Sequence, residues 1–146
     1  MTLREAKRYK ANWFATYVGI TDWHQRIEID AYRRMLVRTP AGREQRFTAT
    51  TYRRTRVYNT PLQGVAAELM LPVLNRLPST TADLDARLVA VVHDEIVLEA
   101  KTADVLSAKK VLEETMVAGM LDIFPGAAKT GLVEVRTGKS WADKKG

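Results

Sequence analysis

The pattern of apolar and polar positions along the chain predicts four helices. Apolar side chains recur every three or four residues, the spacing of one helix face, in residues 3–17, 22–36, 62–77 and 103–121. Thr21 or Asp22 is expected to cap the second helix. The third is expected to begin at residues 59–61, where an asparagine and a threonine precede a proline at the first helical position. Pro72 predicts a kink or an early end, and Pro78 is expected to close this helix.

The same pattern predicts extended segments between the helices. Residues 87–92 and 95–100 are rich in valine and isoleucine and are separated by two residues alone, which predicts an antiparallel hairpin whose tip lacks the usual glycine. Two shorter extended segments, 35–39 and 43–49, flank a Pro-Ala-Gly turn. A last short strand is predicted at 132–136, and a tryptophan soon after it is expected to anchor the tail. Helices, hairpin, helix and strand in this order predict an α+β fold with an antiparallel sheet.

The composition narrows the function without choosing one. A chain of 146 residues is expected to form one compact domain. The absence of cysteine excludes disulfides, thiolate metal sites and a cysteine nucleophile. No signal peptide and no membrane-spanning apolar run is found in the sequence, so the chain is expected to be soluble and intracellular.

The net charge of +6 is concentrated in one segment, residues 26–56, which has nine arginines and three acidic residues. The rest of the chain therefore sums to zero. Arginine suits phosphate because its planar guanidinium donates two hydrogen bonds at once. Charge alone leaves three interpretations open: a nucleic-acid surface, a surface for an acidic protein, or a solvated basic face.

The tip of the predicted hairpin carries the strongest chemical signal. Asp94 and Glu95 lie together where two apolar strands meet, next to His93. Mg²⁺ prefers carboxylate oxygens and is usually held by one or two of them together with substrate phosphates. Two such ions can activate one oxygen and stabilise another in phosphoryl transfer. The alternative is an ordinary polar turn, because aspartate is common in turns.

Five segments, taken in order, resemble the family A (DNA polymerase I-like) DNA polymerases. Residues 59–68 are similar to the family's N-T-P-x-Q-G-T-A-A-D palm helix, and an H-D-E triplet between two apolar strands follows about thirty residues later, as in the family. The other three segments are similar to an E-A-x-x-Y-x-x-x-F-F-x-x-Y-P-G-V stretch, a G-R-x-R turn and a closing G-x-x-W; they are residues 5–20, 42–46 and 138–141. The resemblance covers nearly the whole chain.

The resemblance implies a palm-type antiparallel sheet, made of the catalytic hairpin and a C-terminal strand and packed by helices. Residues 1–50 would be a helical region resembling part of the fingers together with a basic turn, and residues 51–146 the C-terminal palm subdomain. The expected location is the cytoplasm, at the nucleoid if a bacterium or a phage encodes the chain.

The resemblance also implies roles for individual residues. Asp94 matches the second catalytic aspartate, a ligand of Mg²⁺, and Glu95 the neighbouring acid that supports the metal site. His93 matches a residue near the primer 3′ end. Gln63 and Asn59 match residues that contact the minor groove of primer-template DNA, although both can equally be ordinary helix residues.

The basic positions fit the family less closely. Arg43 and Arg46 are expected to contact phosphate or primer, or to be solvated. Thr55 stands where the family usually has an arginine. Either a register shift lets Arg54 or Arg56 make the contact of that arginine, or the contact is lost. Two further departures lie on the palm helix; they are Glu68, where the family has aspartate, and Leu71, where it usually has lysine.

Two parts that a family A polymerase needs lie outside this sequence: the first metal-binding aspartate, in a D-Y-S-x-I-E-like strand, and the fingers helix that grips the incoming triphosphate. The chain is therefore expected to be the C-terminal piece of a split polymerase, completed by an N-terminal polymerase fragment that carries both. The alternatives are a non-catalytic duplex-binding or vestigial palm module, and a structural protein that uses the palm surface for another partner.

Overall fold

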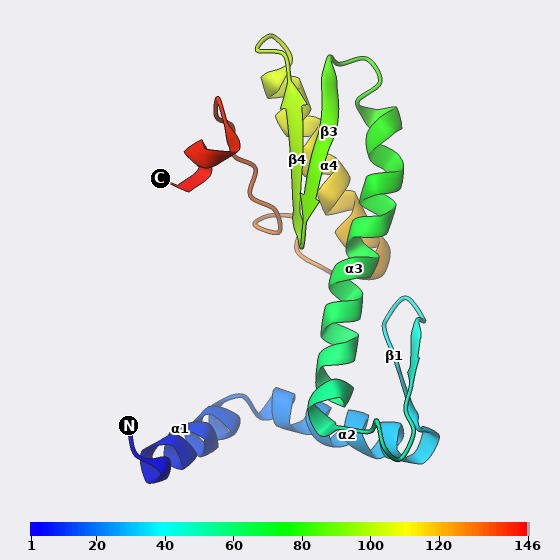
Figure 1. Cartoon of the computed structure of the whole chain (residues 1–146), viewed down its shortest axis with the longest axis vertical. Helices are drawn as coiled ribbons and strands as arrows, with labels where there is room; N and C mark the ends of the chain where they lie inside the picture. The colour runs from blue at the N-terminus through cyan, green and yellow to red at the C-terminus, as the bar shows by residue number, and fades with distance from the viewer. Residues whose placement is uncertain (146) are drawn as a thin grey trace. The chain divides into compact units, whose positions relative to one another are not determined.

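The computed structural model describes residues 1–145, and the chain divides into two compact units, Met1–Gly64 (unit 1) and Val65–Gly146 (unit 2). Helix α3 (Arg54–Thr80) belongs to both units (Figure 1). No helix within residues 1–145 is both long enough and apolar enough to cross a bilayer. The predicted domain division at residue 50 rests on the resemblance and stays a prediction.

Unit 1 begins with two helices, α1 (Leu3–Thr16) and α2 (Val18–Arg34), that are separated by one residue. The N–H of Tyr17 donates to the Trp13 carbonyl and closes α1, while the Tyr17 carbonyl accepts from Ile20 and opens α2. The predicted cap at Thr21 or Asp22 is therefore wrong. The Thr21 hydroxyl instead donates to the Phe14 carbonyl (3.2 Å), which ties the second helix to the first.

A left-handed residue, Met35 (φ 52°), ends α2 and turns the chain into β1 (Leu36–Arg38). Strand β1 pairs antiparallel with β2 (Glu44–Arg46), as the sequence pattern predicts. The core of unit 1 joins α2, β1, the residue after β2 and the start of α3; it consists of Ala31, Val37, Phe47 and Val57.

Helix α3 begins at Arg54, so the predicted start at residues 59–61 is wrong. It continues past both prolines to Thr80, so an early end at Pro72 and the predicted end at Pro78 are wrong too. Each proline lacks the N–H that would bond the carbonyl four residues earlier. Burial offsets that loss, because Val57, Val73 and Leu77 are at most 2% exposed. Packing along this helix therefore overrides the local signal for a break.

Unit 2 packs a β-hairpin against two helices. Strands β3 (Ala86–Val92) and β4 (Glu95–Ala100) form the predicted antiparallel hairpin, and α4 (Val105–Ile123) lies behind it in Figure 1. The core joins three side chains of α3 to one each from β4 and α4; they are Met70, Val73, Leu77, Ile96 and Leu112. A 3₁₀ turn, η1 (Trp141–Lys145), follows near the end of the chain. The predicted α+β class with antiparallel pairing is confirmed.

The C-terminal strand predicted at residues 132–136 is wrong. Within residues 1–145 the hairpin strands pair only with each other. Val135 nevertheless packs against the core of unit 2. The apolar pattern of this segment thus reports a buried side chain, whereas its backbone joins no strand.

Replacing Gly119 by alanine is expected to destabilise unit 2 by about 1 kcal/mol. A Cβ at Gly119 would lie 2.4 Å from Cγ2 of Val73 and 3.2 Å from the Leu69 carbonyl oxygen. Overpacking of this kind costs about 1–3 kcal/mol, which exceeds the gain of about 1 kcal/mol in helix propensity. Gly19→Ala in α2 is the matched control, because a Cβ there meets nothing within 4 Å. Urea denaturation of both variants checks this, and a stabilised Gly119→Ala protein contradicts it.

Candidate functional site

The tip of the β3–β4 hairpin holds its turn in an unusual backbone conformation. Val92 and Glu95 form the last strand pair, so His93 and Asp94 make up the turn. His93 has a φ of 58°, a value that such turns usually obtain from glycine. A non-glycine residue there costs on the order of 1 kcal/mol and is more frequent at functional sites. The hairpin therefore presents Asp94 from a strained turn.

The two carboxylates at this tip have different surroundings. Asp94 is exposed, whereas Glu95 is half-buried. The indole N–H of Trp141 donates to Oε1 of Glu95 (2.8 Å) and joins the C-terminal tail to the hairpin. In the part of the chain that the structure describes, no three His, Asp or Glu side chains are grouped closely enough to hold a metal ion. Both carboxylates of this tip are hard oxygen donors, the kind of ligand that divalent cations prefer.

Sequence reasoning missed the contact between Trp141 and Glu95. The sequence predicted that Trp141 anchors the tail without indicating how; the side chain is 55% exposed and is held through this hydrogen bond. The closing G-x-x-W segment is the signal that points to this tryptophan, although nothing in it names the partner 46 residues away.

Replacing Trp141 by phenylalanine is expected to lower the free energy of unfolding of unit 2 by about 1 kcal/mol. Phenylalanine keeps an aromatic side chain but loses the indole N–H and therefore the hydrogen bond to the carboxylate. Because Trp141 is partly exposed, the expected value lies at the lower end for such bonds. A double-mutant cycle with Glu95→Ala, which removes the acceptor, followed by urea denaturation, isolates the coupling between the two side chains. A coupling energy of zero contradicts the assignment.

Unit 1 brings three of the predicted DNA-contacting residues onto one face of α3. Arg56, Asn59 and Gln63 are all exposed, and their spacing of three and four residues places them on one helix face. Gly64 lies next to Gln63, where an added Cβ would be 2.4 Å from Cγ2 of Thr39. The glycine therefore lets this part of α3 lie close to the turn after β1.

Two of the predicted arginines, Arg46 and Arg54, form ion pairs with acidic neighbours. Arg46 pairs with Oε2 of Glu44 (2.7 Å), while Arg38 pairs with Oε1 of the same carboxylate. These contacts, led by the hydrogen bond from Arg38, lower the pKa of Glu44. Arg54 pairs with Glu28 of α2. Arg43 is exposed in the turn between β1 and β2, and Arg56 has no ion-pair partner within residues 1–145.

Comparisons with known proteins show which family the chain is similar to. The sequence model of the family described as DNA polymerase family A matches residues 1–143. A thermostable DNA polymerase I from Thermus filiformis is 30% identical, with 97% of this chain and 17% of that protein covered. DNA polymerase I from Aquifex aeolicus is 28% identical, with 80% and 20% covered. The chain thus spans about a fifth or less of the length of these relatives.

A solved structure shares the fold. It is the POL domain of Pol1 from M. smegmatis in complex with DNA primer-template and dNTP, and it superposes with a TM-score of 0.73 at 22% identity. The match covers 82% of this chain and 23% of that one. Since the family model spans nearly every residue, the chain belongs to DNA polymerase family A.

Proposed function

We propose that this chain supplies a metal-binding aspartate and primer-template contacts to template-directed nucleotidyl transfer, and that a separate N-terminal polypeptide completes the active centre. The observation that supports this most is the strained hairpin tip, which presents Asp94 to solvent beside a Glu95 that is held by Trp141. By resemblance to the family, Asp94 matches a catalytic aspartate and Glu95 the acid beside it.

The reaction is attack of the primer 3′ hydroxyl on the α-phosphate of a deoxynucleoside triphosphate, which forms a phosphodiester bond and releases pyrophosphate. Asp94 would hold Mg²⁺, and Glu95 would support the site. When bound, Mg²⁺ would favour the deprotonated hydroxyl and stabilise charge on the phosphates. His93 lies at the same tip and would face the primer end.

Within unit 1, α3 would read the duplex. The minor-groove acceptors are nearly the same for every correct base pair, so amide donors check pair geometry without selecting sequence. Asn59 and Gln63 would supply such donors, and Arg56 on the same face would contact phosphate. Arg43, Arg46 and Arg54 would add positive charge around them.

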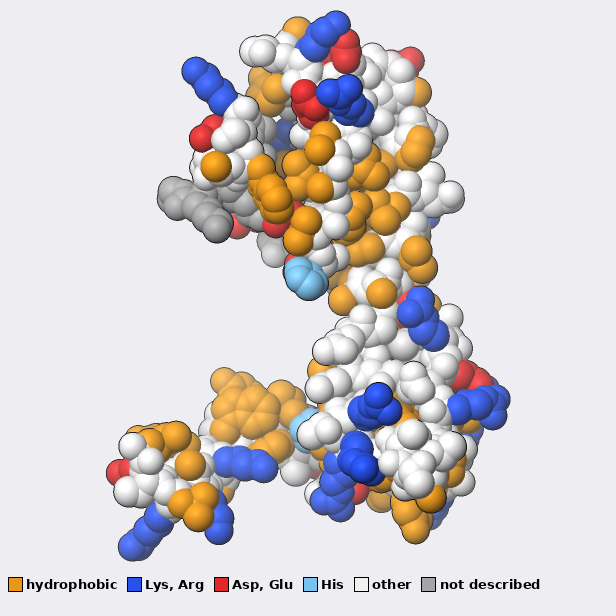
Figure 2. Space-filling model, viewed as in Figure 1, with side chains coloured by type: hydrophobic (Ala, Val, Ile, Leu, Met, Phe, Trp, Pro, Cys, Tyr) orange, Lys and Arg blue, Asp and Glu red, His pale blue; other side chains and the backbone are white. Residues whose placement is uncertain are grey.

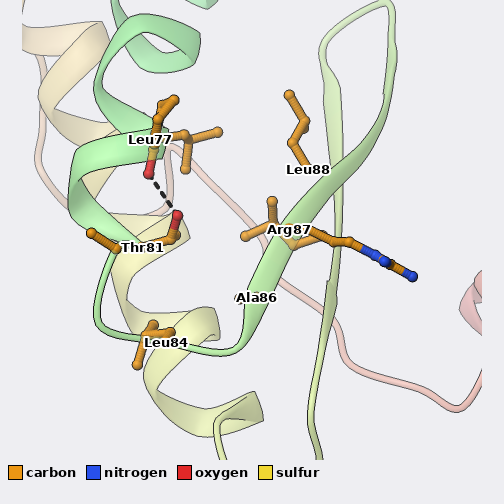
Figure 3. Close-up of a pocket in the computed structure, with 9 residues that line it drawn as sticks. Leu77, Thr81, Leu84, Ala86, Arg87 and Leu88 are labelled. Atoms are coloured by element: carbon orange, nitrogen blue, oxygen red, sulfur yellow. Dashed lines mark hydrogen bonds between the residues drawn. The ribbon is translucent and has the colours of Figure 1, made fainter.

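Unit 2 has exposed apolar surface that a partner polypeptide could cover. Leu88, Val89 and Val91 of β3 are 46%, 55% and 41% exposed. A hollow of about 320 Å³ lies between the end of α3 and β3, with Leu77 on its wall, while Arg87 extends away from it (Figure 3). Figure 2 shows hydrophobic side chains gathered on this part of the molecule. Contiguous apolar surface of this kind marks interaction sites.

Primer extension tests the proposal. The chain is assayed with Mg²⁺ and four triphosphates, alone and mixed with a polypeptide that carries the first aspartate and the nucleotide-binding helix, with Asp94→Ala as the control. The proposal is supported if the mixture extends the primer, the chain by itself does not, and Asp94→Ala abolishes extension by the mixture. No extension in a mixture shown to form a complex contradicts it.

A second function, non-catalytic binding of duplex DNA, is favoured by one observation: the stripe of Arg56, Asn59 and Gln63 lies wholly in unit 1 and needs no metal ligand. Two results together would favour this function. The chain alone would bind duplex DNA with an affinity that falls steeply with salt and is unchanged by Asp94→Ala. The mixture with the N-terminal polypeptide would show no primer extension.

A further inference from the structure

The C-terminal tail of unit 2 contains a hydrogen-bonded turn at residues 138–143. The carboxylate of Asp143 accepts a hydrogen bond from the Ser140 N–H (2.9 Å), and the Asp143 N–H donates to the Ser140 carbonyl (3.1 Å). Gly138 lies directly against this pair, because an added Cβ would be 2.8 Å from Cβ of Asp143 and 3.3 Å from the Ser140 carbonyl oxygen. The turn therefore depends on a glycine at residue 138 and on the acid at residue 143.

Two contacts attach this turn to the rest of unit 2. Before the turn, Val135 packs against the core cluster that contains Ile96, the residue next to Glu95. Within the turn, the Trp141 indole N–H donates to Oε1 of Glu95 (2.8 Å). Because hydrogen bonds fix the backbone on both sides of Trp141, little chain freedom is lost when the indole meets the carboxylate.

The indole restricts a carboxylate that lies beside the candidate metal ligand Asp94. A glutamate side chain has several rotatable bonds and keeps much of that freedom unless a contact removes it. Glu95 is half-buried, and its Oε1 is held by the indole N–H. Groups that orient the carboxylates of a metal site commonly set the affinity of the site for the ion. The tail turn is therefore placed to influence metal binding without being a ligand itself.

We propose that Trp141 is a positioning residue of the metal site. It holds the Glu95 carboxylate beside Asp94 and so lowers the Mg²⁺ concentration at which the site fills. The inference rests on the proposed function, since it takes the hairpin tip as the metal site, and it extends that site to the C-terminal tail. Because Trp141 acts through Glu95, a protein that lacks the Glu95 carboxylate must be insensitive to loss of the indole N–H.

The Mg²⁺ dependence of primer extension tests this role in the mixture with the N-terminal polypeptide. Trp141→Phe is expected to raise the Mg²⁺ concentration for half-maximal extension roughly fivefold, because the carboxylate must then be ordered when the ion binds. The rate at saturating Mg²⁺ is expected to change little. Gly138→Ala is expected to have the same effect, although it keeps the indole. In the Glu95→Ala background, Trp141→Phe is expected to change the Mg²⁺ dependence no further.

Two substitutions serve as matched controls. Trp13→Phe removes another partly exposed indole, and Gly126→Ala adds a Cβ that meets nothing within 4 Å. Neither is expected to change the Mg²⁺ requirement. The proposal is overturned if a control raises that requirement as much as Trp141→Phe does, or if Trp141→Phe has the same effect with and without the Glu95 carboxylate.

Mn²⁺ binding gives a readout that needs no polymerase activity. The electron paramagnetic resonance signal of unbound Mn²⁺ measures its affinity for the full chain, alone and with the N-terminal polypeptide, in the absence of triphosphates. Trp141→Phe is expected to weaken binding roughly fivefold. Equal affinity of Trp141→Phe and the unchanged chain, including no binding by either, contradicts the role of Trp141. Absence of primer extension by the unchanged mixture contradicts the proposed function instead, so the two failures are distinguishable.

Discussion

Replacing Asp94 by asparagine is expected to slow primer extension roughly a thousandfold when the chain is combined with the N-terminal polypeptide. This corresponds to a loss of about 4 kcal/mol of transition-state stabilisation. Asparagine keeps the size of the side chain but offers Mg²⁺ a neutral oxygen in place of a carboxylate. The loss is expected in the rate of the chemical step, because the negative charge matters most when the phosphate is attacked. Single-turnover extension at saturating Mg²⁺ and triphosphate measures it.

Glu95→Gln is the matched control for this prediction, and its expected loss is about tenfold. Glu95 is half-buried and shares its carboxylate with the Trp141 indole, so it is less available to a metal ion than the exposed Asp94. A larger loss for Glu95→Gln than for Asp94→Asn would mean that the two carboxylates have exchanged roles.

Leu77→Ala is expected to lower the free energy of unfolding of unit 2 by about 3 kcal/mol. Leu77 is 2% exposed and packs in the cluster that joins α3 to β4 and α4. Truncating a buried leucine costs about 2–5 kcal/mol, since burial is lost and a cavity remains. The open hollow beside Leu77 allows some collapse, which places the expected value near the middle of that range.

Urea denaturation measures this change, with Leu71→Ala as the control on the same helix. Leu71 is 57% exposed, so its replacement is expected to cost well under 1 kcal/mol. If both variants lose the same free energy, the core of unit 2 does not centre on Leu77.

The hairpin could be predicted from sequence because its signal is local. Two runs of β-branched residues around His93 and Asp94 leave few other structures. The start of α3 could not, because it depends on the tertiary burial of Val57, which precedes the local start signal at residues 59–61. Tyr17 ends one helix and starts the next through its own backbone bonds, and no side-chain pattern announces this.

Some features of the candidate site could also be predicted from sequence, and others could not. Asp94 and Glu95 could be proposed because their triplet is contiguous in sequence. The partners of the arginines could not, since Arg54 meets Glu28 from a different helix. Charge counted along the chain therefore overstates how many guanidinium groups are available for phosphate.

Helix α1 carries no buried residue, although its face includes the exposed Tyr9 and Trp13. A helix of 14 residues without a packed face lies at the margin of stability in water. Its amides are therefore expected to exchange with solvent far faster than those of β3 and β4. A partner that covers Tyr9 and Trp13 must also order the helix, so part of the favourable binding enthalpy offsets the chain entropy that is lost. Binding is also expected to have a negative heat-capacity change, because the aromatic rings leave water.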